Sequence, residues 1–571
     1  MRRHWVFREA EEETVRDLSR ALDLPLLLAR LLIHRGADSK EEARDFLCGE
    51  LSGLAAPESM GDLAAATGLI REAVRRRRKV LLVGDYDVDG LTSAAILYRA
   101  IRHAGGEVEV HIPHRLEDGY GLKAGIIQAA ARDGVRLLIT VDCGTTSFEE
   151  LRLAGSLGME TIVVDHHDLE SGKRPPASAF LNPLEPGCSY PEKELSSAGV
   201  AFTLARGLAQ TDGPARQELW QELDLVALGT IADMAPLTGE NRILVRAGLH
   251  ALRGTRKPGL RALLNRAGLE GEPLCPEDVS FRLAPPLNAV GRIGSAQDSF
   301  RLLVTEDGEE AEALAATAFR ENRARAALER EAYRRALSKV TREVNFSQDR
   351  VIVLHDEAWH PGVIGILATR LAQRFHRPAV VITLSDSICR GSARSIRSFH
   401  LTEALHSLRE HLVEFGGHPG AAGLTLRADR IGGFREALNR LAHERIPREA
   451  LVPAVEVDGE LPLSDLNEEL VAGLEALAPF GTGNPRPVFV CRDAMLSPEG
   501  ERGIFSPSGV RLQVQSAGGR RFEALHPRHL AGDGLNVRRV RGHVLLAYSP
   551  VRRGASPEGR IELRLHDLKL P

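Results

Sequence analysis

The sequence predicts a multidomain α/β protein that ends in a small β-barrel. Short apolar runs typical of buried strands alternate with helical segments over residues 76–305, and this pattern predicts a parallel sheet. Residues 306–347 are rich in Ala, Glu and Arg and predict one long helix. A second α/β region follows over 348–448. Residues 449–571 contain shorter alternating segments with frequent Gly and Pro, which favours a β-barrel.

The first 75 residues predict a helical leader. Apolar side chains around residues 24–32 have helical spacing, and Ala43, Phe46 and Leu47 continue the pattern. The leader ends in the basic run 75–79. Such a run is either a solvated helix face or a surface that follows phosphate groups, and the sequence leaves both interpretations open.

Apolar runs place the strands within the two α/β regions. The predicted strands are residues 80–83, 137–141 and 161–164 in the first region and 350–354 and 379–384 in the second. Between the regions, residues 309–343 contain neither Gly nor Pro, so nothing in that stretch interrupts a helix.

Composition is that of an ordinary globular protein. Hydrophobic residues make up 43% of the 571 residues and charged residues 27%, and the formal net charge of −4 neither favours nor excludes a nucleic-acid partner. The chain starts without a signal-peptide pattern and has no apolar run long enough for a membrane span. Its six cysteines lack metal-site spacing, so we expect reduced thiols and a cytoplasmic protein.

Acidic residues follow the three predicted strands of the first region. Gly-Asp-Tyr-Asp-Val-Asp-Gly spans 84–90, Val-Asp-Cys-Gly spans 141–144 and Val-Asp-His-His-Asp spans 164–168. Because the carboxyl ends of parallel strands meet at one edge of the sheet, we expect these six acids and two histidines to converge. Their mutual repulsion favours divalent cations at this edge, and the pattern therefore predicts a two-metal hydrolytic site.

The ligand types narrow the choice of cation. Alternate residues of an extended segment share a face, which brings Asp85, Asp87 and Asp89 together, and Gly90 then permits a tight turn. Carboxylate oxygens suit Mg²⁺ or Mn²⁺, and the imidazole of His166 favours Mn²⁺. Each motif alone has a structural alternative: a capping turn for the acidic strings and surface exposure for the histidines.

Several strings resemble one known group of enzymes. GDYDVDG, VDCG, VDHHD and ADMAPL are similar to motifs I–IV of the DHH phosphoesterase superfamily. Further strings resemble its RecJ exonuclease family, in the same order along the chain. They are HIPHRLEDGYGL, DLVALGTIADMAPLTGENR, APPLNAVGRIG, WHPGVIGILATRLA, GSARSI, GGHPGAAG and APFGTGNPRPVF. The resemblance implies a DHH domain over 76–305, a connecting helix, a DHH-associated substrate-binding domain over 348–448 and an OB-fold-like domain over 449–571.

The resemblance also implies roles for individual residues. The implied metal ligands are Asp87, Asp89, Asp142, His166 and Asp233. Asp142 would bridge the two cations, Asp85 would assist, and His167 would contact the scissile phosphate, so the implied catalytic residues are His167, Asp142 and Asp85. The implied substrate-binding residues are Arg115, Arg292, Ser392, Arg394, Gly417 and His418. Taken alone, the glycine-rich loop at 416–420 could be an ordinary turn and Arg394 a structural ion pair.

The implied activity is hydrolysis of single-stranded DNA from its 5′ end to 5′-mononucleotides, in recombination and repair. Two Mn²⁺ or Mg²⁺ ions would activate water and stabilise the departing oxygen. Single-stranded DNA is the implied partner, with a single-stranded-DNA-binding protein and a helicase as helpers of a monomeric enzyme. In the basic C-terminal region, Phe505, Phe522 and Tyr548 could stack on bases, or the region could only cap its neighbour. The alternatives are a DHH phosphodiesterase of short oligonucleotides or cyclic dinucleotides, and a metal-free scaffold.

Overall fold

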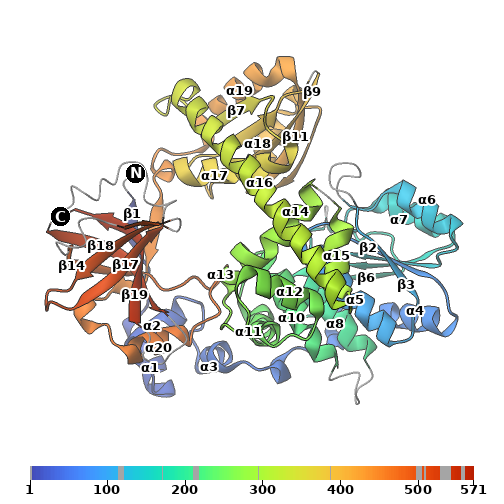
Figure 1. Cartoon of the computed structure of the whole chain (residues 1–571), viewed down its shortest axis with the longest axis horizontal. Helices are drawn as coiled ribbons and strands as arrows, with labels where there is room; N and C mark the ends of the chain where they lie inside the picture. The colour runs from blue at the N-terminus through green and yellow to red at the C-terminus, as the bar shows by residue number, and fades with distance from the viewer. Residues whose placement is uncertain are drawn as a thin grey trace. The chain divides into compact units, whose positions relative to one another are not determined.

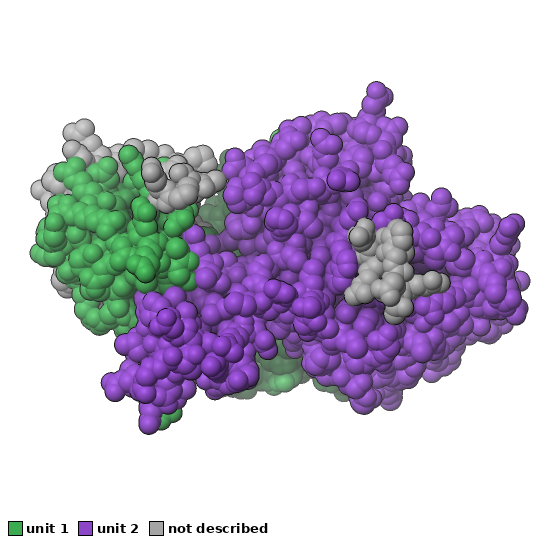
Figure 2. All heavy atoms as spheres, turned by 90° about the horizontal axis from the view of Figure 1, so that it is seen from below, with its two compact units in different colours: residues 1–11, 323–474, 487–571 green, residues 12–322, 475–486 purple. Residues whose placement is uncertain are grey.

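The computed structural model confirms the predicted architecture of two α/β regions, a long helix and a C-terminal barrel (Figure 1). It describes residues 3–113, 121–169, 172–209, 218–293, 295–385, 387–496, 504–506, 509–527, 542–553 and 560–570. The chain divides into two compact units (Figure 2). We call residues 12–322 with 475–486 the first unit, drawn in purple, and residues 1–11 with 323–474 and 487–571 the second unit, drawn in green; the key of Figure 2 numbers the two in the opposite order. No helix among the described residues is both long and apolar enough to cross a bilayer.

The first unit is built on a five-stranded parallel sheet in the order β3-β2-β4-β5-β6. The strands are β2 (Val80–Gly84), β3 (Val108–His111), β4 (Leu137–Val141), β5 (Glu160–Val164) and β6 (Ala179–Leu181). Alternate β2 residues enter two separate cores, Leu82 on one face and Val83 on the other. Since both faces are buried, an uninterrupted apolar run is what such a strand requires, and all three strands predicted in this region are confirmed.

Helices cover both faces of this sheet. The helices of the first unit are α1 (Glu12–Leu22), α2 (Leu26–Ile33), α3 (Lys40–Cys48), α4 (Leu63–Arg75), α5 (Val88–His103), α6 (Ala124–Arg132), α7 (Phe148–Ser156), α8 (Ser197–Leu208), α10 (Leu223–Ala232), α11 (Gly239–Arg253), α12 (Pro258–Ala267), α13 (Pro276–Asp278), α14 (Ala284–Ile293) and α15 (Ala296–Val304). Helices α4, α5, α8 and α10 share one core, and α6 and α7 share the other. Helix α10 is buried along its length, because it lies between α5, α8 and α11.

The long helix α16 (Gly308–Glu343) confirms the predicted connecting helix. The second unit then contains a five-stranded sheet in the order β10-β11-β9-β8-β7, in which only β7 and β8 are parallel. Its elements are β7 (Ile352–Asp356), α17 (Pro361–Phe375), β8 (Ala379–Thr383), β9 (Ile388–Arg394), α18 (Leu401–Ser407), β10 (Glu414–His418), β11 (Ala421–Arg427) and α19 (Ile431–Arg445). The two strands predicted in this region are both present, shifted by up to two residues at their ends.

The C-terminal strands close into a barrel. The strands and the helix of this part are β12 (Ala454–Val457), β13 (Gly459–Glu460), α20 (Glu468–Glu475), β14 (Phe489–Leu496), β15 (Ile504–Ser506), β16 (Gly509–Gln515), β17 (Arg521–Pro527), β18 (His543–Arg553) and β19 (Arg560–Lys569). The pairs β14–β18, β18–β19, β19–β17 and β17–β16 form a series, and the pairing of β16 with β14 completes the ring. Five strands closed in this way are typical of an OB-fold.

At the ends of the chain the structure corrects one expectation and decides against one alternative that the sequence left open. The leader is not helical throughout, because β1 (His4–Phe7) forms a strand that pairs in parallel with β12, and Trp5 Nε1 donates to Asp567 of β19 at 2.8 Å. Nor are Tyr548 and Phe522 exposed for base stacking: both are buried, at 0% and 4% exposure. The Tyr548 hydroxyl donates to the carbonyl oxygen of Leu461 at 2.8 Å. The side chain of Phe505 lies outside the described residues.

We therefore expect Tyr548→Phe to destabilise the barrel. The substitution leaves the buried carbonyl of Leu461 without its donor, which costs about 1–3 kcal/mol. Hydrogen exchange of the β18 amides would measure the loss. Tyr98→Phe is the matched control, because the Tyr98 ring packs edge-on against Phe300 and its hydroxyl makes no hydrogen bond within the described part of the chain. Equal exchange rates in wild type and Tyr548→Phe would contradict the assignment.

Candidate metal centre

Three strand ends bring acidic residues to one edge of the parallel sheet. In register, Gly84 of β2 lies beside Val141 of β4, and Val141 lies beside Val164 of β5. The next residue on each strand is an aspartate: Asp85, Asp142 and Asp165. Asp142 has a left-handed backbone, with φ +58°, which a non-glycine residue adopts only where its surroundings hold it. The sheet register thus sets the spacing of the first acids.

The turn after β2 orders the next two acids. Asp87 caps helix α5, because its Oδ1 accepts from the backbone N–H groups of Asp89 at 3.0 Å and Gly90 at 3.2 Å. A Cβ atom at position 90 would lie 2.5 Å from the carbonyl oxygen of Asp85, so only glycine fits there. Asp89 therefore lies in the first turn of α5, so the three acids do not share one face of an extended segment as expected: Asp85 and Asp87 lie near Asp142, and Asp89 lies near His166 and Asp233.

The N-terminus of helix α8 holds two of these carboxylates. The backbone N–H groups of Ser197 and Ala198 donate to the two oxygens of Asp89 at 2.8 and 3.0 Å, and the Ser197 hydroxyl donates to Asp142 Oδ1 at 3.0 Å. Helix α10 approaches closely from the side: a Cβ atom at Gly229 would lie 2.7 Å from Asp89 Oδ1. Backbone amides and a helix dipole therefore compensate part of the charge buried here.

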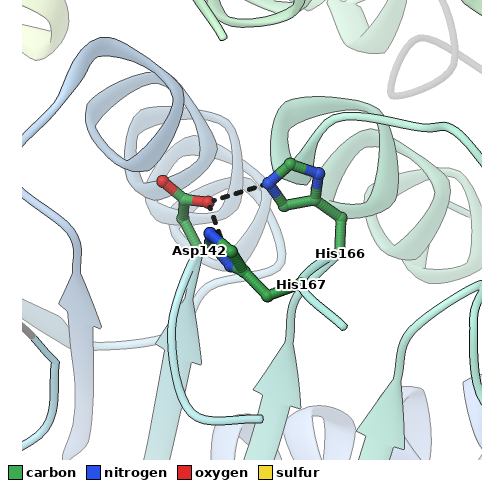
Figure 3. Close-up of side chains that lie close together, drawn as sticks. All are labelled: Asp142, His166 and His167. Atoms are coloured by element: carbon green, nitrogen blue, oxygen red, sulfur yellow. Dashed lines mark ion pairs between the residues drawn. The ribbon is translucent and has the colours of Figure 1, made fainter. Parts of the chain in front are cut away.

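The two adjacent histidines face this cluster from the loop after β5 (Figure 3). His166 Nε2 lies 3.4 Å from Asp142 Oδ1 and 3.9 Å from Asp89 Oδ2, while its Nδ1 lies 4.0 Å from Asp233 Oδ2. His167 Nδ1 lies 4.0 Å from Asp142 Oδ1 and 2.7 Å from Asp165 Oδ1. Asp165 orients His167, since it also accepts from the backbone N–H groups of both histidines and of Thr145.

These side chains form three groups with ligand atoms close enough to share a cation. The groups are Asp142–His166–His167, Asp89–His166–Asp233 and Asp85–Asp87–Asp142, each within 4.8 Å. His166 Nε2 is buried and has no hydrogen-bond partner among the described residues, as expected of a nitrogen that serves as a metal ligand. Because the groups share Asp142 and His166, the donor set fits two neighbouring divalent cations with oxygen and imidazole ligands.

Burial and mutual repulsion make the cluster hold protons when no cation is present. Burial raises the pKa of the Asp89 carboxyl to about 7, and the charge of Asp233 adds to the shift. Burial and the charge of Asp87 likewise raise the pKa of Asp142 well above its usual range. For His167, burial alone would lower the pKa, but the hydrogen bond to Asp165 and the charges of Asp165 and Asp142 together outweigh burial and raise the pKa to about 9. Cations would replace these protons and relieve the same repulsion.

The structure places the expected site residues in three classes. The implied metal ligands, together with Asp85 and His167, converge as described above. Arg115 lies outside the described residues, and Arg292 belongs to α14 with its side chain outside them. Ser392, Arg394, Gly417 and His418 belong to the second unit.

Within the second unit, two of these residues share one face of β9. Arg394 Nη1 donates to Ser392 Oγ at 3.3 Å. Gly365 of α17 has no side chain to cover them, since a Cβ atom there would lie 3.3 Å from Ser392 Oγ. On β10, Gly417 has φ +141° and His418 is exposed. The arrangement leaves a hydroxyl and a guanidinium next to the backbone of Gly365.

Sequence reasoning missed the residues that hold the ligands in place. Ser197 contacts Asp142, and Asn182 Nδ2 donates to the carbonyl oxygen of His167 at 2.9 Å. The string Ser-Ser-Ala-Gly over 196–199 carries a signal for the first, because Ser196 is an N-cap whose Oγ accepts from Gly199 N–H. No sequence pattern marks Asn182, because its role depends on a contact between the end of β6 and the loop that carries His167.

Family models cover much of the chain. Residues 79–230 match the DHH family N-terminal domain, residues 348–444 the DHHA1 domain and residues 457–530 the RecJ OB domain. The chain is 33% identical over 538 residues to the single-stranded-DNA-specific exonuclease RecJ of Escherichia coli, with 91% of each protein covered. The chain belongs to the RecJ family. It is also 38% identical over 494 residues to RecJ of Bacillus subtilis, covering 86% of this chain and spanning 62% of that protein.

Solved RecJ structures agree with the fold. The crystal structure of RecJ from Thermus thermophilus in complex with Mn²⁺ matches with a TM-score of 0.83 and 30% identity, covering 100% of this chain and 80% of that chain. RecJ of that organism in complex with Mg²⁺ matches with a TM-score of 0.76 and 29% identity, covering 100% of this chain and 78% of that one. The fold of T. thermophilus RecJ thus matches that of this chain over its whole length, including the part that carries the acidic cluster.

We predict that the metal-free protein becomes less stable as the pH rises through about 7. Because the folded-state pKa of Asp89 lies above its ordinary value of 3.8, its contribution is fully present below that value and is lost as Asp89 ionises near pH 7. Melting temperatures of chelator-treated protein between about pH 5 and 8 would show the loss, and Mn²⁺ should reverse it. Asp89→Asn cannot ionise and should lose less over that range. A wild-type curve as flat as that of the variant would contradict the prediction.

Proposed function

We propose that this chain is a divalent-cation-dependent exonuclease that hydrolyses single-stranded DNA from the 5′ end and releases 5′-mononucleotides. Membership of the RecJ family supports the activity and the substrate. The observation that carries the chemistry is the convergence of three ligand groups on the shared residues Asp142 and His166. Mn²⁺ and Mg²⁺ are the proposed cations, since both occur in RecJ structures of T. thermophilus.

We assign the residues of the cluster two roles, cation binding and donation toward the substrate. Asp87, Asp89, Asp142, His166 and Asp233 would hold two cations, with Asp85 assisting. When bound, the cations would supply an activated water and stabilise the departing oxygen. His167, held by the hydrogen bond between its Nδ1 and Asp165, would donate a proton or a hydrogen bond toward the scissile phosphate.

The second unit supports substrate binding. Ser392 and Arg394 offer a hydroxyl and a forked guanidinium side by side, a pair suited to a terminal phosphate. With Gly417 and His418 on the strand β10 of the same sheet, they form our proposed 5′-end site, and Arg115 and Arg292 are proposed to line the strand's path. The OB-fold barrel, locally rich in Arg, is proposed to bind the backbone of single-stranded DNA, without stacking by Tyr548 or Phe522.

Membership of the RecJ family also supports a proposal for the cellular setting. We propose action in the cytoplasm as a monomer, with a single-stranded-DNA-binding protein and a helicase as helpers in recombination and repair. The free state of all six cysteines supports a reducing compartment.

Asp142→Asn should lower nuclease activity by about 10³-fold or more, because the carboxylate common to two of the three ligand groups loses its charge. Initial rates on labelled single-stranded DNA at saturating Mn²⁺ would measure the loss. Asp168→Asn is the matched control, since Asp168 follows the two histidines but is exposed and lies outside the three groups. Activity near the wild-type level in Asp142→Asn would refute the proposed mechanism.

Substrate ends separate this activity from a phosphodiesterase of short oligonucleotides or cyclic dinucleotides. On a strand of about 50 nucleotides with one end blocked by a bulky group, we expect mononucleotides when the 3′ end is blocked and little product when the 5′ end is blocked. Degradation that starts at the 3′ end, or inertness beyond a few nucleotides, would overturn the proposal.

Arg394→Ala should weaken the use of a 5′-phosphorylated end, measured as a rise in KM.

A further inference from the structure

Asp233 differs from the other acids of the cluster in how it is held. Asp87, Asp89 and Asp142 each accept a hydrogen bond from a backbone amide or a hydroxyl. No hydrogen bond holds the Asp233 carboxylate within the described ranges, and its side chain is 28% exposed. Its position toward His166 and Asp89 therefore depends on the backbone that carries it.

That backbone turns sharply directly after Asp233. Helix α10 ends at Ala232, and Met234 adopts a left-handed conformation with φ +64° while its side chain is exposed. A left-handed conformation costs free energy in a residue that has a Cβ atom. The exposed Met234 side chain makes no core contacts that would offset this cost. A backbone of this kind persists only where neighbouring contacts hold it.

A segment from far along the chain supplies such contacts. Residues 475–486 pack with the first unit, although the residues on both sides of them in sequence belong to the second. The carbonyl oxygen of Thr482 accepts from the N–H of Leu237 at 2.7 Å. Gly481 and Gly483 lie against the turn: a Cβ atom would come within 2.7 Å of the Leu237 side chain at Gly481 and 3.1 Å of the Pro236 side chain at Gly483.

The segment is itself anchored by buried polar groups. Asn484 is fully buried, and its Nδ2 donates to the carbonyl oxygens of Leu477 and Pro479, both at 2.8 Å. Arg35 Nε donates to Asn484 Oδ1 at 2.7 Å. Arg242, 2% exposed, donates to the carbonyl oxygens of Leu477 and Ala478 at 2.9 and 2.8 Å. These bonds fix the segment rigidly against the chain that follows Asp233.

We propose that residues 475–486 act as a positioning element for Asp233, and so for the cation held by Asp89, His166 and Asp233. The inference rests on the proposed cation site. The segment touches no ligand; it fixes the turn from Met234 to Leu237, and the turn fixes the carboxylate. This assigns a role to two strings of the chain, Thr-Gly-Glu-Asn-Arg over 238–242 and Pro-Phe-Gly-Thr-Gly-Asn over 479–484, that the catalytic chemistry leaves without one.

Two variants of the full-length chain test the proposal. Asn484→Ala removes three hydrogen bonds within the anchor, and Gly483→Ala places a methyl group against Pro236 and Thr238 where φ is +74°. Calorimetric titration with Mn²⁺ alone measures the number and affinity of bound ions, and hydrogen exchange at Leu237 reports the turn. Thr255→Val is the matched control: it removes one hydrogen bond to Asp224, at the opposite end of α10.

We expect wild type to bind two Mn²⁺ ions. In both variants, one of the two should bind about 10-fold more weakly or worse, the scale of losing an outer support of a ligand, and the Leu237 amide should exchange faster. Thr255→Val should keep both affinities despite a lower melting temperature. If wild type binds two ions and both variants do so equally well, or if Leu237 exchanges as slowly as in wild type, the positioning role is wrong. If wild type itself binds no ions, the proposed cation site is wrong instead.

Discussion

Two buried carboxylates that approach the same histidine nitrogen are the constraint on which this protein is built. Asp89 and Asp142 are almost fully buried, at 1% and 3% exposure, and both approach the same nitrogen of His166. Charges of like sign buried together carry a large free-energy cost unless they are protonated, hydrogen-bonded or neutralised by cations. The N-terminus of α8 provides hydrogen bonds to both carboxylates. Bound cations would neutralise the negative charge that these bonds do not compensate.

This constraint explains why elements far apart in sequence meet at one sheet edge. The parallel register supplies Asp142 and Asp165 at neighbouring strand ends, and the α5 turn supplies the three acids of the first motif. Glycines permit the close approaches: Gly90 at the turn and Gly229 on α10. Asp165 orients His167, so one carboxylate of the cluster acts on a histidine, whereas its neighbours face the cation positions. Asp165 thus holds His167 by a hydrogen bond, while Asp142, Asp89 and Asp233 lie beside His166.

The sequence predicted those features that depend on local pattern. Strands 80–83, 137–141 and 161–164 are visible because both faces of the sheet are buried, and the convergence of Asp85, Asp142 and His166 follows from parallel topology alone. Features that depend on partners distant in sequence were not predictable. β1 is a strand because β12 lies beside it, and Tyr548 can be buried because the carbonyl oxygen of Leu461 accepts a hydrogen bond from its hydroxyl. The support that Ser197 gives Asp142 likewise requires α8 to point at the cluster, which periodicity cannot reveal.

Two cations held by these side chains would show in anomalous diffraction at the manganese edge, from crystals of the wild-type protein soaked in Mn²⁺. We expect two anomalous peaks about 3.5–4 Å apart, one on each side of Asp142, with His166 and Asp233 bound to the same ion. A single peak remote from Asp142, or none at this sheet edge at millimolar Mn²⁺, would contradict this expectation.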